Sequence, residues 1–332
     1  MHSKVLITGH RGQLGEYLAD ICLANELTVH GVGRDGIVNN LLTGETVMPC
    51  SLFYKDQVFS LIESQQYLTI YNLAAASSVA MSWDQPLESF QVNTLPIINL
   101  LEAVRVTSKT TRLFQASSSE AYSLNQATKI GELSCFKPGS PYGISKSAAS
   151  MFVDLYREKY EIEAINGILF ANESPKRNEN FVTMKIVKFL VDYSFNRTGV
   201  LEIGNIDIPR DFGFSGEYAR LIYNIMQASQ LKNVIIASGE KVTLRHFIER
   251  ICDQLEIFLS WHGEDLDLIG VDDATGKAMI VTAEKFYRPK EVGIPSVETR
   301  VLAEHYKMDV TVKANELVKI LVDAEKEKHD RF

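Results

Sequence analysis

Two short segments carry side chains that could transfer protons. The segment S-S-S-E-A-Y, residues 117–122, places the carboxylate of Glu120 directly behind three serine hydroxyls. The segment S-P-Y-G-I-S-K-S places Tyr142 and Lys146 four residues apart, so that both side chains share one face of a helix. An ammonium beside a phenol lowers the phenol pKa, and the tyrosinate can then take the proton of an alcohol during oxidation. Each segment also has a simpler interpretation, because Y-x-x-x-K is common on surface helices and serines with a glutamate are ordinary loop residues.

A glycine loop near the N-terminus favours the chemical interpretation. I-T-G-H-R-G-Q-L-G places Gly9, Gly12 and Gly15 between a β-branched run and a helical segment. Glycines there allow a tight turn and the close approach of a pyrophosphate, which the helix N-terminus stabilises. The alternative is a purely structural turn. His10, inside this loop, is expected to face solvent.

The end of the second strand bears on the choice of dinucleotide. G-V-G-R-D-G places Arg34 first and Asp35 beside it. An arginine suits the 2′-phosphate of NADP, whereas an acidic residue suits the ribose hydroxyl of NAD. Arg34 therefore predicts NADP, with NAD as the alternative and a solvated surface charge as the simpler interpretation of the residue.

Apolar, strand-like runs alternate with segments of helical period through the first half of the chain. We expect strands at 4–8, 28–33, 69–74, 112–117 and 163–170, and helices at 13–25, 86–107 and 141–160. Buried strands that are each followed by a helix predict an α/β fold with a doubly wound parallel Rossmann sheet, which binds ligands at the carboxyl ends of its strands.

The pattern changes after residue 170. A polar segment, a helix at 184–196 and a core strand at 233–239 precede a more irregular remainder. We predict a dinucleotide-binding domain formed by residues 1–170 and 205–238. Residues 171–204 and 239–332 are expected to form a smaller, discontinuous C-terminal lobe that binds substrate.

Composition excludes several classes of function. The 332 residues carry a net charge of −8, which argues against nucleic acid as the main partner. No apolar run is long enough to cross a bilayer, and no signal peptide precedes the first strand. We therefore expect no membrane partner and a cytoplasmic location. The four cysteines are scattered and are expected to be buried thiols, and the histidines have no metal-ligand spacing, so no metal is predicted.

Taken together, these motifs resemble the GDP-mannose 4,6-dehydratase family, within the extended short-chain dehydrogenases/reductases. The similarity runs over nearly the whole length, through nine blocks in the family's order: TGHRGQLGEYL, IYNLAA, QASSSEAY, SPYGISK, NGILFANESPKR, NFVTMKI, IPRDFG, ASGEKVTLRHF and YRPKEV. Nine blocks in register are far more specific than any one of them.

The resemblance implies a role for each catalytic position. Tyr142 and Lys146 match the pair that oxidises C4 of a sugar, and Ser118 matches the hydroxyl group that binds the C4 oxygen. Glu120 matches the carboxylate that removes the C5 proton and then protonates the departing C6 hydroxyl. Hydride returns to C6, so the implied activity is a hydro-lyase acting on GDP-mannose or a related GDP-sugar.

The resemblance also implies binding residues. Positions expected to hold the dinucleotide are Gly9, Gly12, Gln13, Leu14, Gly15, Arg34, Leu73, Ala75, Tyr142, Lys146, Asn172 and Arg177. Positions expected to hold the nucleotide sugar are Ser119, Glu173, Asn180, Lys185, Arg210, Arg245, Arg288 and Glu291. Converging arginines suit bidentate contacts to phosphates. A homo-oligomer, either a dimer or a tetramer, is also implied.

Several positions depart from the family pattern while the catalytic positions are kept. Cys50-Ser51-Leu52 replaces the usual Gly-Asp-Leu after the third strand, so that Ser51 stands at the position of the aspartate, and Ala76 and Ser78 replace the usual Gln and His. The departures suggest the same reaction on a different sugar nucleotide, or a specialised relative. Two alternatives stay open: a 4-ketoreductase or epimerase of the same superfamily, and a non-catalytic nucleotide-binding relative.

Overall fold

The computed structural model describes residues 3–33, 38–40, 44–122, 129–287, 293 and 296–329. The chain divides into two compact units, each built from discontinuous pieces. The first unit comprises residues 1–170, 215–237 and 297–310, and the second comprises residues 171–214, 238–296 and 311–332. Residues 205–214 thus lie in the second unit and residues 297–310 in the first, which differs from the boundaries expected from the sequence.

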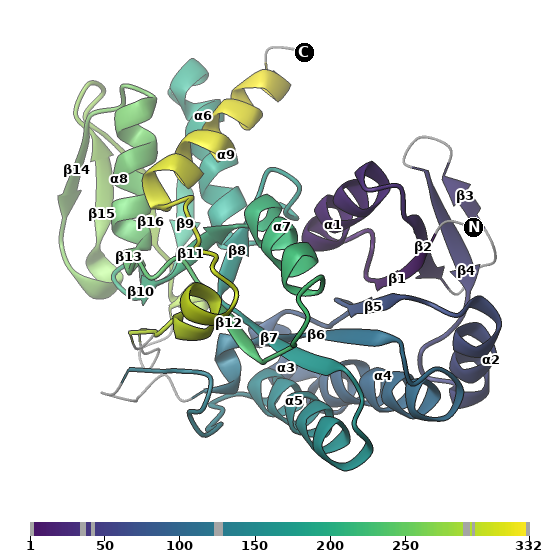
Figure 1. Ribbon diagram of the computed structural model, residues 1–332. Coiled ribbons are helices and arrows are strands. Elements are labelled where there is room, and N and C mark those ends of the chain that lie inside the picture. Colours follow the sequence, from purple (N-terminus) through teal and green to yellow (C-terminus); the bar gives the residue numbers. More distant parts are fainter. Residues whose placement is uncertain are drawn as a thin grey trace. The chain divides into compact units, whose positions relative to one another are not determined.

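The first unit is built on an eight-stranded sheet in the order β12-β7-β6-β5-β1-β2-β4-β3, with only β3 antiparallel to its neighbour (Figure 1). Its strands are β1 (Lys4–Thr8), β2 (Thr28–Gly33), β3 (Val38–Asn40), β4 (Glu45–Pro49), β5 (Thr69–Asn72), β6 (Arg112–Ser118), β7 (Ala164–Leu169) and β12 (Val234–Ile236). The seven parallel strands confirm the predicted doubly wound α/β fold.

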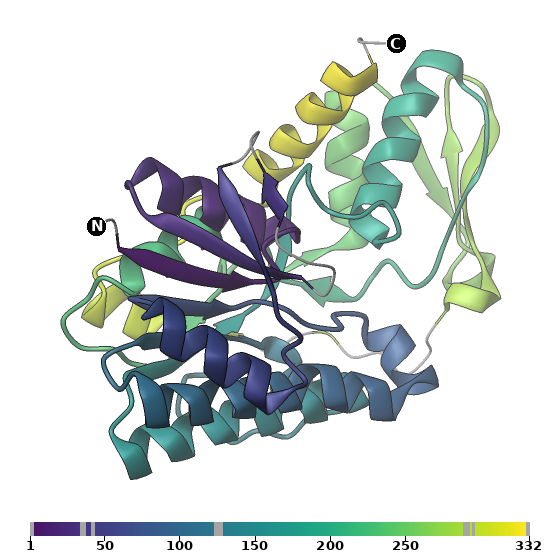
Figure 2. The same ribbon diagram turned by 90° about the vertical axis from the view of Figure 1, so that its right-hand side faces the viewer.

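Helices cover both faces of this sheet (Figure 2). The helices are α1 (Gln13–Ala24), α2 (Lys55–Gln65), α3 (Val79–Asp84), α4 (Pro86–Thr107), α5 (Pro141–Tyr160) and α7 (Ser215–Ile225), with short turns at Ser119–Ala121 and Val301–His305. One core joins α1 and α7 to Val5, Ile7 and Phe114, and the other joins α2, α4 and α5 to Leu6, Ile70 and Leu113. Alternate residues of each strand face opposite cores, which explains why the strands are apolar throughout.

The second unit has its own core beneath a four-stranded sheet, β14-β15-β16-β9. Its strands are β8 (Ala171–Glu173), β9 (Leu201–Ile203), β10 (Pro209–Arg210), β11 (Phe212–Phe214), β13 (Val242–Thr243), β14 (Leu259–His262), β15 (Ile269–Asp272) and β16 (Lys277–Thr282). Its helices are α6 (Val182–Asn196), α8 (Leu244–Gln254) and α9 (Ala314–His329), with a short turn at Asp265–Asp267 between β14 and β15 and another at Glu284–Phe286 after β16. Leu190, Phe247 and Leu321, one from each helix, are fully buried in this core.

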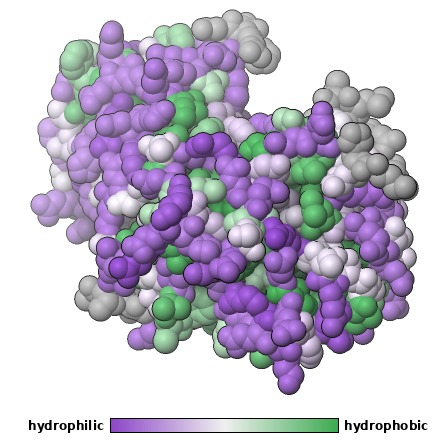
Figure 3. Space-filling view, viewed as in Figure 1, coloured by the Kyte–Doolittle hydropathy of each residue, from purple (hydrophilic) through white to green (hydrophobic). Residues whose placement is uncertain are grey.

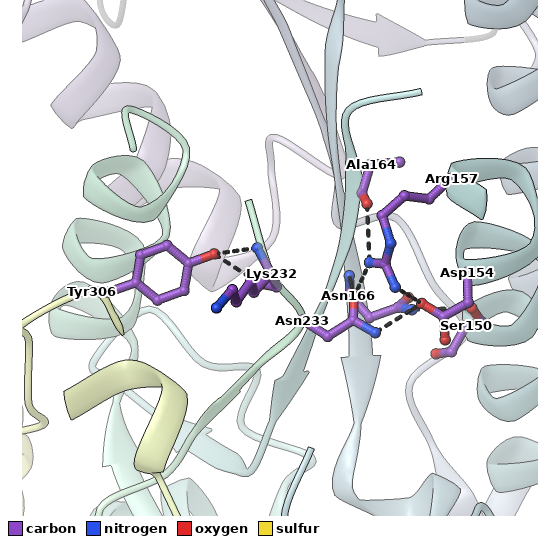
Figure 4. A network of polar contacts seen from close by, with 8 residues as sticks. All are labelled: Ser150, Asp154, Arg157, Ala164, Asn166, Lys232, Asn233 and Tyr306. Atoms are coloured by element: carbon purple, nitrogen blue, oxygen red, sulfur yellow. Dashed lines mark hydrogen bonds and ion pairs between the residues drawn. The ribbon is translucent and has the colours of Figure 1, made fainter. Parts of the chain in front are cut away.

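A partly buried polar network ties α5 to the strands at one side of the first unit (Figure 4). The side-chain oxygen of Asn233 accepts from Arg157 (2.7 Å) and from the Asn166 amide (2.9 Å), and the Asn233 amide donates to Asp154 (2.8 Å). Arg157 also donates to Asp154 at 2.8 Å. The network fixes α5, which carries the Tyr–Lys pair, against the sheet.

No helix in the described part of the chain is long and apolar enough to cross a membrane. The face shown in Figure 3 is mostly hydrophilic, with small groups of hydrophobic residues between. Cys22, Cys50 and Cys252 are buried free thiols, as expected, whereas Cys135 is exposed, so the expectation of burial was wrong for it. Cys135 lies in the irregular segment before α5, where no strand or helix covers it.

Candidate active site

The glycine loop joins β1 to the N-terminus of α1. Gly9 has a left-handed φ of +71°, and a Cβ there would come within 2.8 Å of the Ala74 nitrogen. A Cβ on Gly15 would lie 2.2 Å from the Gly9 oxygen, so α1 can begin this close to the loop only with glycine at that position. Gly12 caps the helix with no side-chain hydrogen bond, and Gln13 and Leu14 form the first turn. The loop thus leads directly into the N-terminus of α1, the end of a helix that favours an anion.

The loop after β5 packs on this glycine loop. The amides of Leu73 and Ala74 both donate to the Thr8 hydroxyl at 3.1 Å, and Ala75 follows them. Leu73 and Ala75, predicted to contact the dinucleotide, thus lie beside Gly9 at the carboxyl ends of adjacent strands.

Tyr142 and Lys146 occupy the first turns of α5. Pro141 is the first helical residue, and the Ser140 hydroxyl caps the helix by accepting from the Gly143 amide at 3.0 Å. Both predicted side chains are buried, with 8% of Tyr142 and 3% of Lys146 exposed. The Lys146 ammonium lies 6.0 Å from the centre of the Tyr142 ring, so a positive charge stands beside the phenol, as the spacing predicted.

The ammonium of Lys146 is held by the sheet. It donates to the main-chain carbonyl of Ala116, in β6, at 2.9 Å. Burial lowers the pKa of Lys146 from its usual value to about 8. The cause is desolvation, which disfavours the charged form. A lysine with a lowered pKa beside a tyrosine is a strong candidate for proton transfer near neutral pH.

Glu120 lies in the short helical turn that follows β6. The Ser118 hydroxyl accepts from the Glu120 amide at 3.2 Å and so caps this turn. Because a hydroxyl can donate as well as accept, the cap leaves the Ser118 proton for a ligand oxygen. The next residues pack on α5: the Ala121 carbonyl accepts from the Ser147 hydroxyl at 3.3 Å. Ser119, half-buried, is in the same turn.

The structure therefore brings Ser118, Glu120, Tyr142 and Lys146 to one end of the sheet, on the strand two places from β1 and on the helix that covers it. A hydroxyl donor, a carboxylate, a phenol and an ammonium in one place can move the proton of an alcohol whose hydride passes to a bound acceptor, and can also move a proton on a neighbouring carbon.

In the second unit, predicted binding residues form a cluster around Arg177. Its guanidinium donates to the Asn172 carbonyl at 2.7 Å, forms an ion pair with Glu173 at 3.0 Å, and stacks over the Phe181 ring at 3.8 Å. The Thr183 hydroxyl donates to Glu173 at 2.6 Å. Burial raises the pKa of Glu173, while Arg177 and Thr183 act to lower it. The cluster makes Glu173 a buried partner of Arg177.

Two further predicted substrate residues of the second unit, Arg245 and Lys185, have protein partners of their own. Arg245 makes a two-pronged ion pair with Asp207, at 2.6 and 2.8 Å, and lies over the Trp261 ring. Lys185 donates to the Glu202 carbonyl at 2.9 Å. Arg210 lies in β10, and Asn180 is exposed. Arg34, Arg288 and Glu291 lie outside the described residues.

Two features of the site were missed from the sequence. His10 was expected in solvent, but this was wrong: its ring is buried, and a Cβ on Gly31 would come within 2.4 Å of it. The glycine at position 31 leaves the space that the ring fills. The second feature is a row of polar side chains along the strand ends, which includes Thr8, Asn72 and Gln115. In the sequence these polar residues stand near the end of each apolar run, and that position could have predicted the row.

No group of three or more His, Cys, Asp or Glu side chains that could hold a metal ion occurs among the described residues. A hollow of about 440 Å³ lies at the carboxyl end of β4, lined by Pro49, Cys50, Ser51, Phe53, Tyr54 and Gln57.

The fold and the Tyr–Lys pair beside a glycine loop define an extended short-chain dehydrogenase/reductase. A solved UDP-glucose 4-epimerase from Thermotoga maritima superposes with a TM-score of 0.82 at 18% identity, covering 98% of this chain and 99% of that one. RMD from Pseudomonas aeruginosa, complexed with NADPH, superposes with a TM-score of 0.79 at 17% identity, covering 98% and 99%. At these identities the likeness shows the fold alone.

Sequence comparison identifies the family. The sequence model of the family described as GDP-mannose 4,6 dehydratase matches residues 6–321. The enzyme of that name from Dictyostelium discoideum is 32% identical over 96% of this chain and 94% of its own length. The Vibrio cholerae enzyme is 35% identical over 88% of this chain and 85% of its own length. The chain belongs to the GDP-mannose 4,6-dehydratase family, as its motifs predicted.

Proposed function

We propose that this protein is a nucleotide-sugar 4,6-dehydratase that converts GDP-mannose, or a related GDP-sugar, to its 4-keto-6-deoxy product. The observation that carries the proposal is the position of Glu120, in a turn packed on the helix that bears Tyr142 and Lys146. With a bound dinucleotide, a tyrosine and a lysine supply the proton transfer that oxidation or reduction of an alcohol needs. A carboxylate beside them adds the means to eliminate water.

The cradle formed by Gly9, Gly12 and Gly15 at the start of α1 fits a dinucleotide diphosphate, because a Cβ on Gly9 or Gly15 would clash with main-chain atoms. A bound nicotinamide would accept the hydride of C4 and later return it to C6. Gly9, Gly12, Gln13, Leu14 and Gly15 would bind the diphosphate, and Leu73 and Ala75 would border the adenosine half. Lys146 would hold the nicotinamide ribose, and Asn172 and Arg177 are proposed further contacts.

In the oxidation step, Tyr142 takes the C4 hydroxyl proton, and Ser118 donates a hydrogen bond to the C4 oxygen. Lys146 stabilises the tyrosinate, because its positive charge lies beside the phenol ring. The resulting 4-ketone acidifies the proton on C5.

In the elimination step, Glu120 removes the C5 proton and delivers it to the C6 hydroxyl, which leaves as water. When the hydride returns to C6, the proton that Tyr142 had taken restores C5. The atoms balance: the sugar loses one water, and the dinucleotide ends as it began. One carboxylate can serve both transfers because C5 and C6 are adjacent.

NADP is the proposed dinucleotide, with NAD as the alternative. Arg34, which follows β2 in the sequence, supports NADP, and solved proteins of this fold carry either NADPH or NAD. The test is to titrate the protein with NADPH and NADH by fluorescence. Arg34→Ala is expected to weaken NADPH about tenfold and leave NADH unchanged; equal effects on both would contradict the proposal.

The nucleotide sugar is proposed to be bound by Ser119 and by residues of the second unit, namely Glu173, Asn180, Lys185, Arg210, Arg245, Arg288 and Glu291. The names of the relatives support a GDP-sugar. The arginines would offset the net charge of −8 around an anionic ligand.

Mass spectrometry of the product tests the activity. With GDP-mannose and dinucleotide, the wild type is expected to produce a species lighter by one water. Glu120→Gln, which keeps the size but not the basicity of the side chain, is expected to oxidise C4 and form reduced dinucleotide without losing water. An epimerase would give no change of mass, and a ketoreductase would consume reduced dinucleotide. A protein that turns over none of the GDP-sugars would be a non-catalytic relative.

We also propose that the protein is a homo-oligomer, a dimer or a tetramer. Helix α5 exposes Ile144, Met151 and Leu155 in one stripe, at 51, 61 and 55%, and α4 exposes Leu87 and Leu95. A second copy of the chain fits such a surface, because a two-fold axis can pair each stripe with its own copy. Light scattering would test this: Met151→Glu with Leu155→Glu is expected to yield monomers, and a monomeric wild type would exclude the proposal.

A further inference from the structure

A row of buried polar side chains crosses four neighbouring strands of the parallel sheet. Thr8, Asn72, Gln115 and Asn166 lie in register with one another on β1, β5, β6 and β7. None is more than 2% exposed. Their strand neighbours two residues before, Leu6, Ile70, Leu113 and Ala164, all belong to the core under α4 and α5. The row therefore faces the helix that carries Tyr142 and Lys146.

Three members of the row form a directed chain of hydrogen bonds. The Thr8 hydroxyl donates to the Asn72 side-chain oxygen at 2.6 Å, and accepts from the amides of Leu73 and Ala74. The Asn72 side-chain nitrogen donates to the Gln115 side-chain oxygen at 2.6 Å. These contacts leave one orientation for the Gln115 amide, with its oxygen toward Asn72 and its nitrogen away from it.

The nitrogen end of Gln115 meets the Lys146 ammonium at a shared acceptor. Gln115 Nε2 donates to the Ala116 carbonyl oxygen at 2.9 Å, and Lys146 Nζ donates to the same oxygen at 2.9 Å. Two donors on one carbonyl oxygen constrain each other, because each occupies a lone-pair direction that the other cannot use.

We propose that Gln115 is a positioning residue for Lys146: through the Ala116 carbonyl that both groups share, its amide fixes where the ammonium lies, and Asn72 and Thr8 hold that amide in its orientation. The inference rests on the proposed function insofar as Lys146 takes part in catalysis. It adds to the site a buried residue of the sheet that was not among the predicted catalytic or binding residues.

The electrostatic consequence has a definite sign. The Gln115 Nε2 hydrogens carry partial positive charge and share the lone pairs that would otherwise stabilise the ammonium alone. Both effects disfavour the charged form of Lys146, in the same direction as its burial. Removing the Nε2 donor is therefore expected to raise the pKa of Lys146. A larger fraction of the side chain would then be charged near neutral pH.

Two substitutions at position 115 separate the donor from the side-chain volume. Gln115→Met keeps the length of the side chain and removes both polar ends. Gln115→Glu keeps the shape and the acceptor toward Asn72 but cannot donate to Ala116 when ionised. The matched control is Asn166→Leu, which removes a buried amide in the same register row, one strand away. Asn166 donates to the Ser150 carbonyl and to Asp154, and so is tied to a different part of α5.

The readout is the protonation of Lys146 itself, followed by NMR of the full-length protein labelled at the lysine Cε and Nζ, with Lys146→Arg to assign the signal. The wild type is expected to titrate near its lowered pKa of about 8. Gln115→Met and Gln115→Glu are expected to raise the midpoint by about one unit or more. Asn166→Leu is expected to leave it at the wild-type value.

The proposal is overturned if both Gln115 variants titrate as the wild type does, or if Asn166→Leu shifts the midpoint as much as they do. In the second case the effect would be a general loosening of the sheet. If Gln115→Met does not fold, Gln115→Leu, which also removes the donor without adding a charge, decides the outcome, since the carboxylate of Gln115→Glu raises the pKa of Lys146 by its own charge. The titration needs no turnover, so it can be measured even if the protein has no dehydratase activity. A negative result for the role of Gln115 would therefore not count against the proposed function, and an inactive protein would not count against the role of Gln115.

Discussion

The main-chain carbonyl of Glu120 lies against the α-carbon of Gly143, so close that a Cβ on Gly143 would come within 2.3 Å of that oxygen. Gly143 follows Tyr142 in the sequence, and the Ser147 hydroxyl one turn further on donates to Ala121. The glycine is thus the means by which the glutamate turn and the Tyr–Lys helix pack together. The proposed elimination chemistry would depend on the sheet end and the helix being joined at this point.

Gly143→Ala is therefore expected to displace the Glu120 turn. Overpacking of this kind costs about 1–3 kcal/mol of stability, and we expect water elimination to fall further than C4 oxidation. Product mass and dinucleotide absorbance would measure the two steps. Gly139→Ala is the control, because a Cβ there meets nothing within 4 Å. Equal activity of the two variants would contradict the packing role.

Lys146→Met is expected to stabilise the protein while abolishing its activity. The buried ammonium has a pKa of about 8, against 10.5 for an ordinary lysine. The unfolded chain therefore binds more protons between these values, and the stability contribution rises with pH across that window. Below it, the wild type bears the full cost of a buried charge.

Thermal unfolding at pH 7 and at pH 9–10 measures this. At pH 7 the free energy of unfolding of Lys146→Met should exceed that of the wild type by about 1–3 kcal/mol. Lys146→Met should also lack the increase in stability that the wild type shows at higher pH. Lys159→Met, an exposed substitution on the same helix, is the control and should behave as the wild type does. A destabilised Lys146→Met protein would indicate that the ammonium is structurally required.

His10 is expected to make the glycine loop sensitive to acid. Its ring is 4% exposed, and neither ring nitrogen has a hydrogen-bond partner within the part of the chain that the structure describes. Burial, then Arg11, lower its pKa, and Glu16 acts to raise it. The unfolded chain thus takes up the proton first, near pH 6.5, so stability is full above that pH and is lost as pH falls below it.

Replacing His10 with Phe should flatten this loss. We expect His10→Phe to match or exceed the wild-type melting temperature at pH 7, since two unsatisfied nitrogens are removed, and to lose less between pH 7 and 5. The buried His30, whose pKa is also lowered, keeps part of the slope in both proteins. His262→Gln, at an exposed position, is the control. An unchanged slope in His10→Phe would exclude the role.

Asn233→Leu is expected to cost about 2–4 kcal/mol of stability, because it leaves Arg157, Asp154 and the Asn166 amide without their shared partner. Chemical denaturation would measure this. Gln227→Leu, exposed on the connection from α7 to β12, should stay within about 0.5 kcal/mol of the wild type. Similar losses from both would mean that the network contributes little.

Much of this protein is determined by local sequence. The alternation of apolar strands with helices predicted the parallel sheet, because burial on both faces requires apolar runs. The glycine loop and the Y-x-x-x-K spacing predicted a redox site, because each depends on a few neighbouring residues, whereas the role of Glu120 came from the family resemblance. The family blocks then added the substrate class.

Tertiary structure decided what depends on contacts between distant segments. Nothing near His10 in the sequence indicates that Gly31 leaves room for its ring, and nothing near Gly143 indicates its contact with Glu120. The meeting of Gln115 and Lys146 at the Ala116 carbonyl requires the register of β6 and the placement of α5 together. Local patterns encode which elements form and which side chains they carry, whereas burial and shared hydrogen-bond partners arise only when residues far apart in the chain pack together.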